Sequence, residues 1–157
     1  IARLLRRSGR FFPETLVRGM ELEYRQSLSF LPGVLKGLTV HANYSRTYAE
    51  VIYPSLAPHR IAGGLSYSIG RVGIYTNMNW SADTPRSTNG NNYTRHRLDA
   101  DMGGAYRISS RASFFFTAKN ILNTPQIQMT NRIAGPAMAT LEEVWGTEWV
   151  FGFKGSF

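Results

Sequence analysis

The last nine residues of the chain, 149–157, alternate large apolar side chains with small or polar ones, and this pattern allows very few folds. One face of the segment carries Trp149, Phe151, Phe153 and Phe157, and the other carries Val150, Gly152, Lys154 and Ser156. Successive side chains of a β-strand point to opposite faces, whereas a helix would mix the two sets on every side. The period of two therefore predicts a strand that meets an apolar environment on one face only.

The same alternation recurs in six stretches upstream. They are residues 20–30, 38–48, 61–69, 72–81, 97–108 and 112–119, with Phe115 interrupting the pattern in the last of them. No helical periodicity competes with it in any of these stretches. Together with the final segment, they predict seven strands and an all-β fold.

The connections between the expected strands alternate in length. Tight turns are expected at residues 31–34, 69–71 and 108–111, and longer loops at residues 50–59, 83–93 and 130–147. Tight turns that alternate with long loops are typical of an antiparallel up-and-down transmembrane β-barrel, in which the turns face the periplasm. If the last strand runs inward, all three tight turns fall on that periplasmic side.

Aromatic side chains give a second indication of this topology. Tyr48, Trp80 and Trp149 are expected near the external ends of their strands, and Phe30, Tyr67, Tyr106 and Phe157 near the periplasmic ends. Two rows of aromatic rings, one at each interface, are typical of the girdles of membrane barrels.

Composition excludes a helical membrane protein. The mean hydropathy is -0.24, and no window approaches the roughly 18 uninterrupted apolar residues of a transmembrane helix. A transmembrane barrel escapes this test because every second residue faces water. The chain contains no cysteine, as suits the oxidising route to the outer membrane. Because the chain begins at Ile1 without a secretory signal, we expect it to be the C-terminal piece of a longer protein.

Three stretches resemble the C-terminal barrel of TonB-dependent receptors. Residues 18–24, RGMELEY, are similar to a glycine–glutamate strand of that family. Residues 116–125, FTAKNILNTP, are close to its asparagine–leucine segment, with Gln126 at a position where an aromatic residue is common. Residues 145–147, WGT, precede the terminal strand but lack the usual arginine. In this family the barrel assembly machinery recognises a terminal aromatic, so the resemblance assigns an assembly signal to Trp149, Phe151, Phe153 and Phe157.

The resemblance implies that residues 1–157 are the C-terminal part of a receptor barrel in the bacterial outer membrane. Family receptors close about 22 strands around a plug domain. Residues 1–14 would then be a loop or the end of a preceding strand, and no plug domain would be present. Seven strands do not make a closed barrel, because bacterial barrels use even numbers and lipid does not tolerate open strand edges.

The function implied by the resemblance is high-affinity uptake of a solute such as a siderophore, a vitamin or a glycan. The expected partners are outer-membrane lipid and lipopolysaccharide, the barrel assembly machinery, the TonB complex acting through the absent plug, and a small-molecule cargo. Contacts with the cargo are expected from the external loops, at Tyr53, Arg86, Asn91, Tyr93, Arg132 and Glu142.

Catalysis is not expected from this sequence. His41, His59 and His96 are scattered and lack the spacing of metal ligands, so neither a metal nor another cofactor is expected. Glu21 and Glu23 fit a ladder of charges in the lumen better than an acid–base pair. The basic residues do not form the patch that a nucleic-acid partner would need.

Two alternatives to a receptor stay open. The first is a passive porin or another outer-membrane barrel, which shares the strand pattern but has no plug. The second is a soluble β-barrel or sandwich that acts as a binding module, in which the apolar faces pack on each other.

Overall fold

The computed structural model describes residues 15–131 and 135–155, and the regular secondary structure of this part is antiparallel β-strand apart from one short 3-10 helix, η1 (Gly33–Gly37). Seven strands form the main sheet: β1 (Val17–Ser27), β2 (Leu38–Ala49), β3 (His59–Ile69), β4 (Val72–Ser81), β7 (Arg97–Arg107), β8 (Ala112–Lys119) and β11 (Glu148–Gly155). No helix among the described residues is long and apolar enough to span a membrane.

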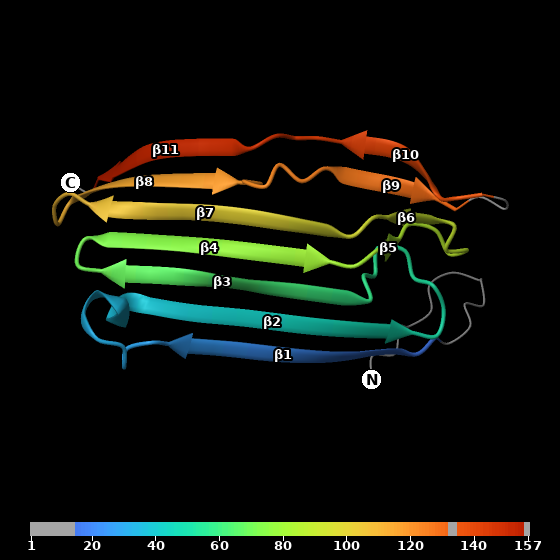
Figure 1. Cartoon of the computed structure of the whole chain (residues 1–157), viewed down its shortest axis with the longest axis horizontal. Coiled ribbons are helices and arrows are strands. Elements are labelled where there is room, and N and C mark those ends of the chain that lie inside the picture. Colours follow the sequence, from blue (N-terminus) through green and yellow to red (C-terminus); the bar gives the residue numbers. More distant parts are fainter. Residues whose placement is uncertain (1–14, 132–134, 156–157) are drawn as a thin grey trace, which may run out of the picture.

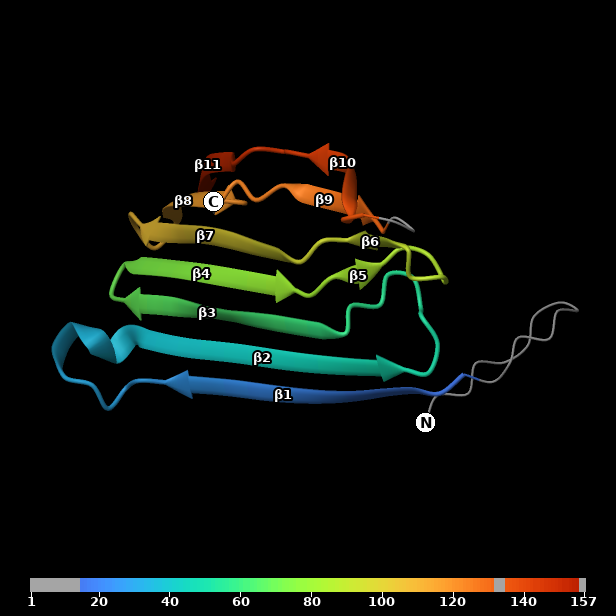
Figure 2. The same cartoon turned by 45° about the vertical axis from the view of Figure 1, so that its right-hand side comes forward.

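The main sheet confirms the seven predicted strands and the all-β class. Its spatial order, β1-β2-β3-β4-β7-β8-β11, follows the order along the chain, and every neighbouring pair is antiparallel. Figure 1 shows the strands side by side. Figure 2 shows that the sheet is curved, with β8 and β11 turned away from the plane of β1 and β2. The first strand ends at Ser27 and not at Phe30, since the Leu31 N–H donates to the Leu28 carbonyl across a turn at 2.9 Å.

The pairing register places the apolar residues of all seven strands on one side, which we call the apolar face. The pairs Tyr24↔Ala42, Tyr44↔Ile61 and Ile61↔Trp80 are examples, and direct partners share a face. The large apolar side chains of this face are Met20, Leu22, Tyr24, Leu38, Val40, Tyr44, Tyr48, Ile61, Leu65, Tyr67, Ile69, Val72, Ile74, Met78, Trp80, Leu98, Met102, Tyr106, Phe114, Phe116, Trp149, Phe151 and Phe153. The intervening residues form the polar face.

Two aromatic rings on the polar face lie over glycines. Phe115 pairs with Gly152, where an added Cβ would come within 2.5 Å of the Phe115 ring. Tyr75 pairs with Gly103 in the same way, at 2.6 Å. The interruption of the alternation at Phe115 is therefore a cross-strand aromatic–glycine pair and not a break in the strand.

The connections at the two ends of the sheet differ in kind. The links β1–β2, β3–β4 and β7–β8 lie at one end, which we call the turn end, and β11 also finishes there (Figure 1). The link β2–β3 and the two long hairpin connections lie at the opposite end, the loop end. The links β3–β4 and β7–β8 are tight, as predicted, but the β1–β2 link, residues 28–37, contains η1 and is as long as the β2–β3 link, residues 50–58, so the predicted alternation of tight turns and long loops holds only in part.

The aromatic residues expected at strand ends lie there in the main sheet. Tyr48, Trp80 and Trp149 are each one residue from the loop end of their strands. Tyr67 and Tyr106 lie near the turn end of β3 and β7. Phe30 lies in the turn after β1, and Phe157 lies outside the described residues.

The expectation that residues 83–93 and 130–147 are loops was wrong in part. These hairpin connections contain β5 (Thr84–Pro85), β6 (Asn92–Thr94) and β10 (Met138–Glu143), which form a second, four-stranded sheet with β9 (Gln126–Thr130). Its order, β10-β9-β6-β5, parallels the order β11-β8-β7-β4, so this loop-end sheet prolongs two hairpins of the main sheet. At two and three residues, β5 and β6 are too short to show a period of two, and the β6–β9 pairing joins distant segments.

The main sheet has no hydrophobic core within the described residues. The buried apolar residues there are Ala57, Ala100 and Ala118, and no large side chain is fully buried. Leu22 is 58% exposed and Phe153 is 78% exposed, although both belong to the apolar face. The sheet is a single layer with β1 and β11 at its two edges, and these strands do not pair with each other. The apolar face therefore needs a cover that the described residues do not supply.

Candidate functional site

The candidate site lies on the polar face near the loop end, where the main sheet meets the loop-end sheet. A hollow of about 390 Å³ opens there, and its polar lining comes from four strands of the main sheet and from β5. The lining includes Asn43, Ser45, Arg60, Asn79, Thr84 and Asp99. Amides, hydroxyls, one guanidinium and one carboxylate in a single hollow can hydrogen-bond to a polar solute.

Alternation along the strands had placed Asn43, Ser45, Asn79 and Asp99 on the polar side, but it did not distinguish them from other polar positions. Arg60 and Thr84 lay outside the expected strands. Asn43 and Arg60 come from β2 and β3, and Asn79 and Asp99 come from β4 and β7. The register places Asn43 opposite Ala62, Ala62 opposite Asn79, and Asn79 opposite Asp99. Only this register brings the three polar side chains into one row across the sheet.

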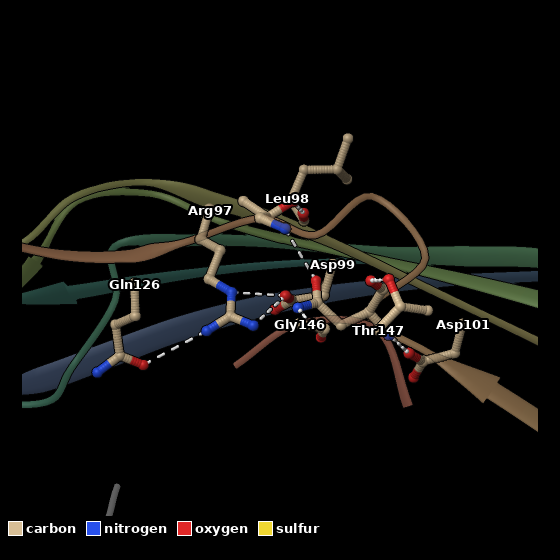
Figure 3. Close-up of polar contacts among 9 residues, drawn as sticks. Arg97, Leu98, Asp99, Asp101, Gln126, Gly146 and Thr147 are labelled. Carbon is tan, nitrogen blue, oxygen red and sulfur yellow. Dashed lines mark hydrogen bonds and ion pairs between the residues drawn. The ribbon is translucent and has the colours of Figure 1, made fainter. Parts of the chain in front are cut away.

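Arg97 anchors one side of the site by contacts with its own strand, with β9 and with the segment before β11, and Figure 3 shows the first two of these. Its Nε donates to the Asp99 carboxylate at 2.5 Å, and its Nη1 donates to the Gln126 side chain on β9 at 3.4 Å. The guanidinium also lies over the Trp145 ring, 5.4 Å from its centroid. The Arg97 side chain is only 15% exposed, so its charge is balanced by Asp99 within a half-buried cluster.

Asn120 joins the two sheets at the point where β8 ends. Its backbone φ of 52° lies in the left-handed region that asparagine tolerates. The Asn120 N–H donates to the Asp101 carboxylate at 2.9 Å, and its Nδ2 donates to the Gly146 carbonyl at 2.9 Å. Its Oδ1 accepts from the Thr124 N–H at 3.0 Å, and its carbonyl accepts from the Thr147 hydroxyl at 3.1 Å. One residue therefore connects β7, the 120–125 turn and the segment before β11.

Replacing Asn120 tests this junction. Asn120→Ala removes two side-chain hydrogen bonds. It also places alanine, which tolerates positive φ less well than asparagine does, in the left-handed region. We therefore expect the unfolding free energy to fall by about 2–3 kcal/mol. Asn120→Gly removes the same hydrogen bonds but is free of strain at this φ, and it should lose about 1 kcal/mol less. Urea unfolding of the full-length protein in detergent measures both. Equal losses for the two variants would contradict the strain at this position.

The residues predicted to contact the cargo are spread over the loop end. Tyr93 lies on β6 opposite Met129, and Glu142 lies on β10 opposite Ile127, so the register places both on one face of the loop-end sheet. Arg86 follows β5 and donates from its Nη1 to the side-chain oxygen of Gln128. Gln128 pairs with Thr94 and lies on the opposite face from Tyr93. The structure therefore groups Tyr93 with Glu142 and separates both from Arg86.

Asn91 and Tyr53 lie beside this sheet in connecting segments. The Asn91 carbonyl accepts from the Asn131 N–H at 2.8 Å, and the Asn91 N–H donates to the Asn89 side chain at 3.1 Å. Tyr53 is 40% exposed in the β2–β3 link, which is joined to β5 by a hydrogen bond from the Ser55 N–H to the Pro85 carbonyl at 2.7 Å. Arg132 and Phe157 lie outside the described residues.

The site offers groups that can hydrogen-bond to a ligand. No cluster of three or more histidine, aspartate or glutamate side chains able to hold a metal ion occurs in residues 15–131 and 135–155. Comparisons with known proteins add no relative: no protein-family model, no curated protein and no solved structure matches this chain.

Proposed function

We propose that this chain is part of the β-barrel of a TonB-dependent receptor in the bacterial outer membrane and takes part in uptake of a polar solute. The observation that carries the proposal is a single-layer antiparallel sheet with one continuous apolar face, against which none of the described segments packs. Lipid would cover the apolar face, and the polar face would line the lumen.

Strand length supports a membrane-spanning sheet. Five strands of the main sheet, β1 to β4 and β7, have 10 to 12 residues. Such a strand is roughly 33–40 Å long, and at a tilt of about 45° it crosses roughly 23–28 Å, close to the apolar band of known barrels. Tyr48, Trp80 and Trp149 at the loop end and Tyr67 and Tyr106 at the turn end would then meet the two interfaces.

The polar face supports transport of a solute in preference to a chemical reaction. The hollow near the loop end carries Asn43, Arg60, Asn79 and Asp99 but no nucleophile paired with a base. In the proposed orientation this hollow opens toward the external side, where a scarce solute would first be bound. Tyr53, Arg86, Asn91, Tyr93 and Glu142 at the loop end remain the predicted contacts, together with Arg132, which lies outside the described residues.

The family resemblance agrees with the role of one structural element. Residues 116–125 resemble a segment of TonB-dependent receptors, and this same stretch contains the Asn120 junction. At this position the chain leaves the main sheet and enters the loop-end sheet with a backbone conformation in the left-handed region. Asparagine tolerates this conformation better than most residues, which gives a physical reason for its presence there.

The topology is tested by cysteine labelling in intact bacterial cells that carry the full-length protein. The chain has no cysteine, so a single introduced cysteine in it is unambiguous against a background checked with the unsubstituted protein. We expect Asn89→Cys, at the loop end, to react with a membrane-impermeant maleimide. Ser109→Cys, at the turn end, should react only after the outer membrane is opened. Equal labelling of both sites in intact cells would contradict the proposal.

A conductance measurement separates the receptor from the passive porin. The full-length protein in a planar bilayer should conduct little, because a plug domain would close the lumen. Stable, ohmic channels would favour the porin. Failure of the purified protein to associate with lipid vesicles would favour the soluble binding module.

A further inference from the structure

The charged side chains at the turn end of the main sheet all carry positive charge. Residues 28–38, 67–73, 105–113 and 153–155 make up this end, and none of them is an aspartate or a glutamate. The charged residues in these ranges are Lys36, Arg71, Arg107, Arg111 and Lys154. The nearest acids along β7 and β11 are Asp101 and Glu148, each six positions from the basic residue of its strand. Six positions span roughly 20 Å, about two Debye lengths at physiological salt, so these acids do not neutralise the turn end.

Three of the basic residues line a hollow of about 290 Å³ at the turn end. The hollow is bounded by the end of β7, the β7–β8 turn, the start of β8 and the end of β11, which lie together in Figure 1. Its size is at the lower end of the range for small-molecule sites. The polar residues of its lining are Arg107, Arg111, Lys154, Ser109, Ser110 and Ser113.

The strand register places a hydroxyl between two of these cations. Ser113 on β8 pairs with Arg107 on β7 and with Lys154 on β11, so the three residues form one row on the polar face. Neighbouring strands lie about 4.8 Å apart, so the Cα atoms of Arg107 and Lys154 are roughly 10 Å apart. An anion seated above Ser113 is within reach of both long side chains and of the hydroxyl.

The cations of this hollow have donors left for a ligand. Arg107 donates from its Nη2 to the Gly70 carbonyl at 2.8 Å, which orients the guanidinium and occupies only one of its nitrogens. Neither Arg111 nor Lys154 makes a side-chain hydrogen bond or an ion pair within the described part of the chain. All three side chains are exposed, so a ligand in solution can reach them.

We propose that this hollow binds the dianionic phosphate group of a soluble phosphomonoester or of inorganic phosphate. A phosphate dianion offers two negative charges and at least three acceptor oxygens, which suit two guanidinium groups, one ammonium group and a serine hydroxyl. A carboxylate or a phosphodiester carries a single charge and balances the three cations less well.

This site requires neither a membrane nor a closed barrel, so it does not depend on the proposed function. It lies at the opposite end of the sheet from the hollow lined by Asn43, Arg60, Asn79 and Asp99. In the proposed orientation it would face the periplasm.

The site is tested by phosphorus NMR titration of the full-length protein in a nonionic detergent, with methyl phosphate as the probe at about pH 8, where the monoester is a dianion. Arg111→Gln/Lys154→Gln should bind the probe about tenfold more weakly. The matched control, Arg25→Gln/Lys119→Gln, removes one arginine and one lysine from the polar face outside the hollow and should bind as the unsubstituted protein does.

Two further variants separate a built site from a general attraction of charge. Ser113→Ala leaves every charge in place but removes the hydroxyl between the cations, so it should weaken binding about fivefold. Arg111→Lys/Lys154→Arg keeps both charges and should bind within about twofold of the unsubstituted protein.

Several results would overturn this site. They are equal weakening by the two glutamine variants, unchanged binding by Ser113→Ala, and loss of binding when both charges are kept. Equally tight binding of dimethyl phosphate, a monoanionic diester, would remove the preference for a dianion. Tighter binding of phosphatidic acid in detergent than of methyl phosphate would assign the hollow to a lipid headgroup. Failed cysteine labelling, by contrast, would reject the proposed function and leave the phosphate site standing.

Discussion

Leu65→Arg should prevent the full-length protein from inserting stably into a bilayer. Leu65 lies in the middle of β3 on the apolar face and is 46% exposed in the isolated sheet. On a water-facing surface an arginine at such a position would cost little. Facing hydrocarbon near the bilayer centre, it costs about 2–4 kcal/mol, because the guanidinium loses its hydration.

The neighbouring residue supplies the matched control for this variant. Ser66→Arg introduces the same side chain on the polar face of the same strand, where water or the lumen would solvate it. Urea titration of both variants in dilauroyl-phosphatidylcholine vesicles measures the difference in unfolding free energy. A loss for Leu65→Arg no larger than that for Ser66→Arg would mean that the apolar face does not meet lipid.

Gly64→Ala should cost roughly 3 kcal/mol, the upper end of the range for overpacking. A methyl group at Gly64 would overlap the main-chain carbonyl oxygen of Thr76 on β4 and would come within 2.9 Å of the His41 ring. A backbone atom of a paired strand cannot rotate aside as a side chain can. The β3–β4 pairing would have to open locally, so the variant should unfold at lower urea and accumulate poorly in the outer membrane.

Gly73→Ala is the control for Gly64→Ala. It is the same substitution within the adjacent strand on the same face, and a Cβ at Gly73 meets nothing within 4 Å. Because alanine loses less backbone entropy than glycine on folding, this variant should be neutral or slightly more stable. Similar unfolding midpoints for the two variants would contradict the close approach of β3 and β4 at Gly64.

Most of the main sheet could be predicted from local pattern, and one segment shows why. In residues 72–81, Val72, Ile74, Met78 and Trp80 alternate with glycine and mainly polar side chains along β4, with Thr76 as the polar exception on the apolar face. A two-residue period is visible in a single strand without knowledge of its neighbours. The tight turn at Gly70 was equally local, because its φ of 56° favours glycine at that position.

The candidate site could be predicted only in part. The sequence predicted that Asn43, Asn79 and Asp99 lie on the polar sides of their strands. It did not predict that they lie side by side across the sheet, because this depends on the register, and a shift of one residue would move a strand's side chains to the other face. The sequence showed that the segment around Asn120 resembles a segment of TonB-dependent receptors. It could not show the hydrogen bonds of Asn120 to Asp101 and Gly146, because these residues lie 19 and 26 positions away in the chain.

The amino-acid sequence alone determined which residues form the main strands and which side of each strand is apolar, because both follow from the chain's own alternation. Tertiary structure decided the rest. It paired β6 with β9 to make the loop-end sheet, and it brought Arg107, Ser113 and Lys154 together from three strands. Those results depend on the register between strands, which arises from hydrogen bonds and side-chain contacts among residues far apart in the chain.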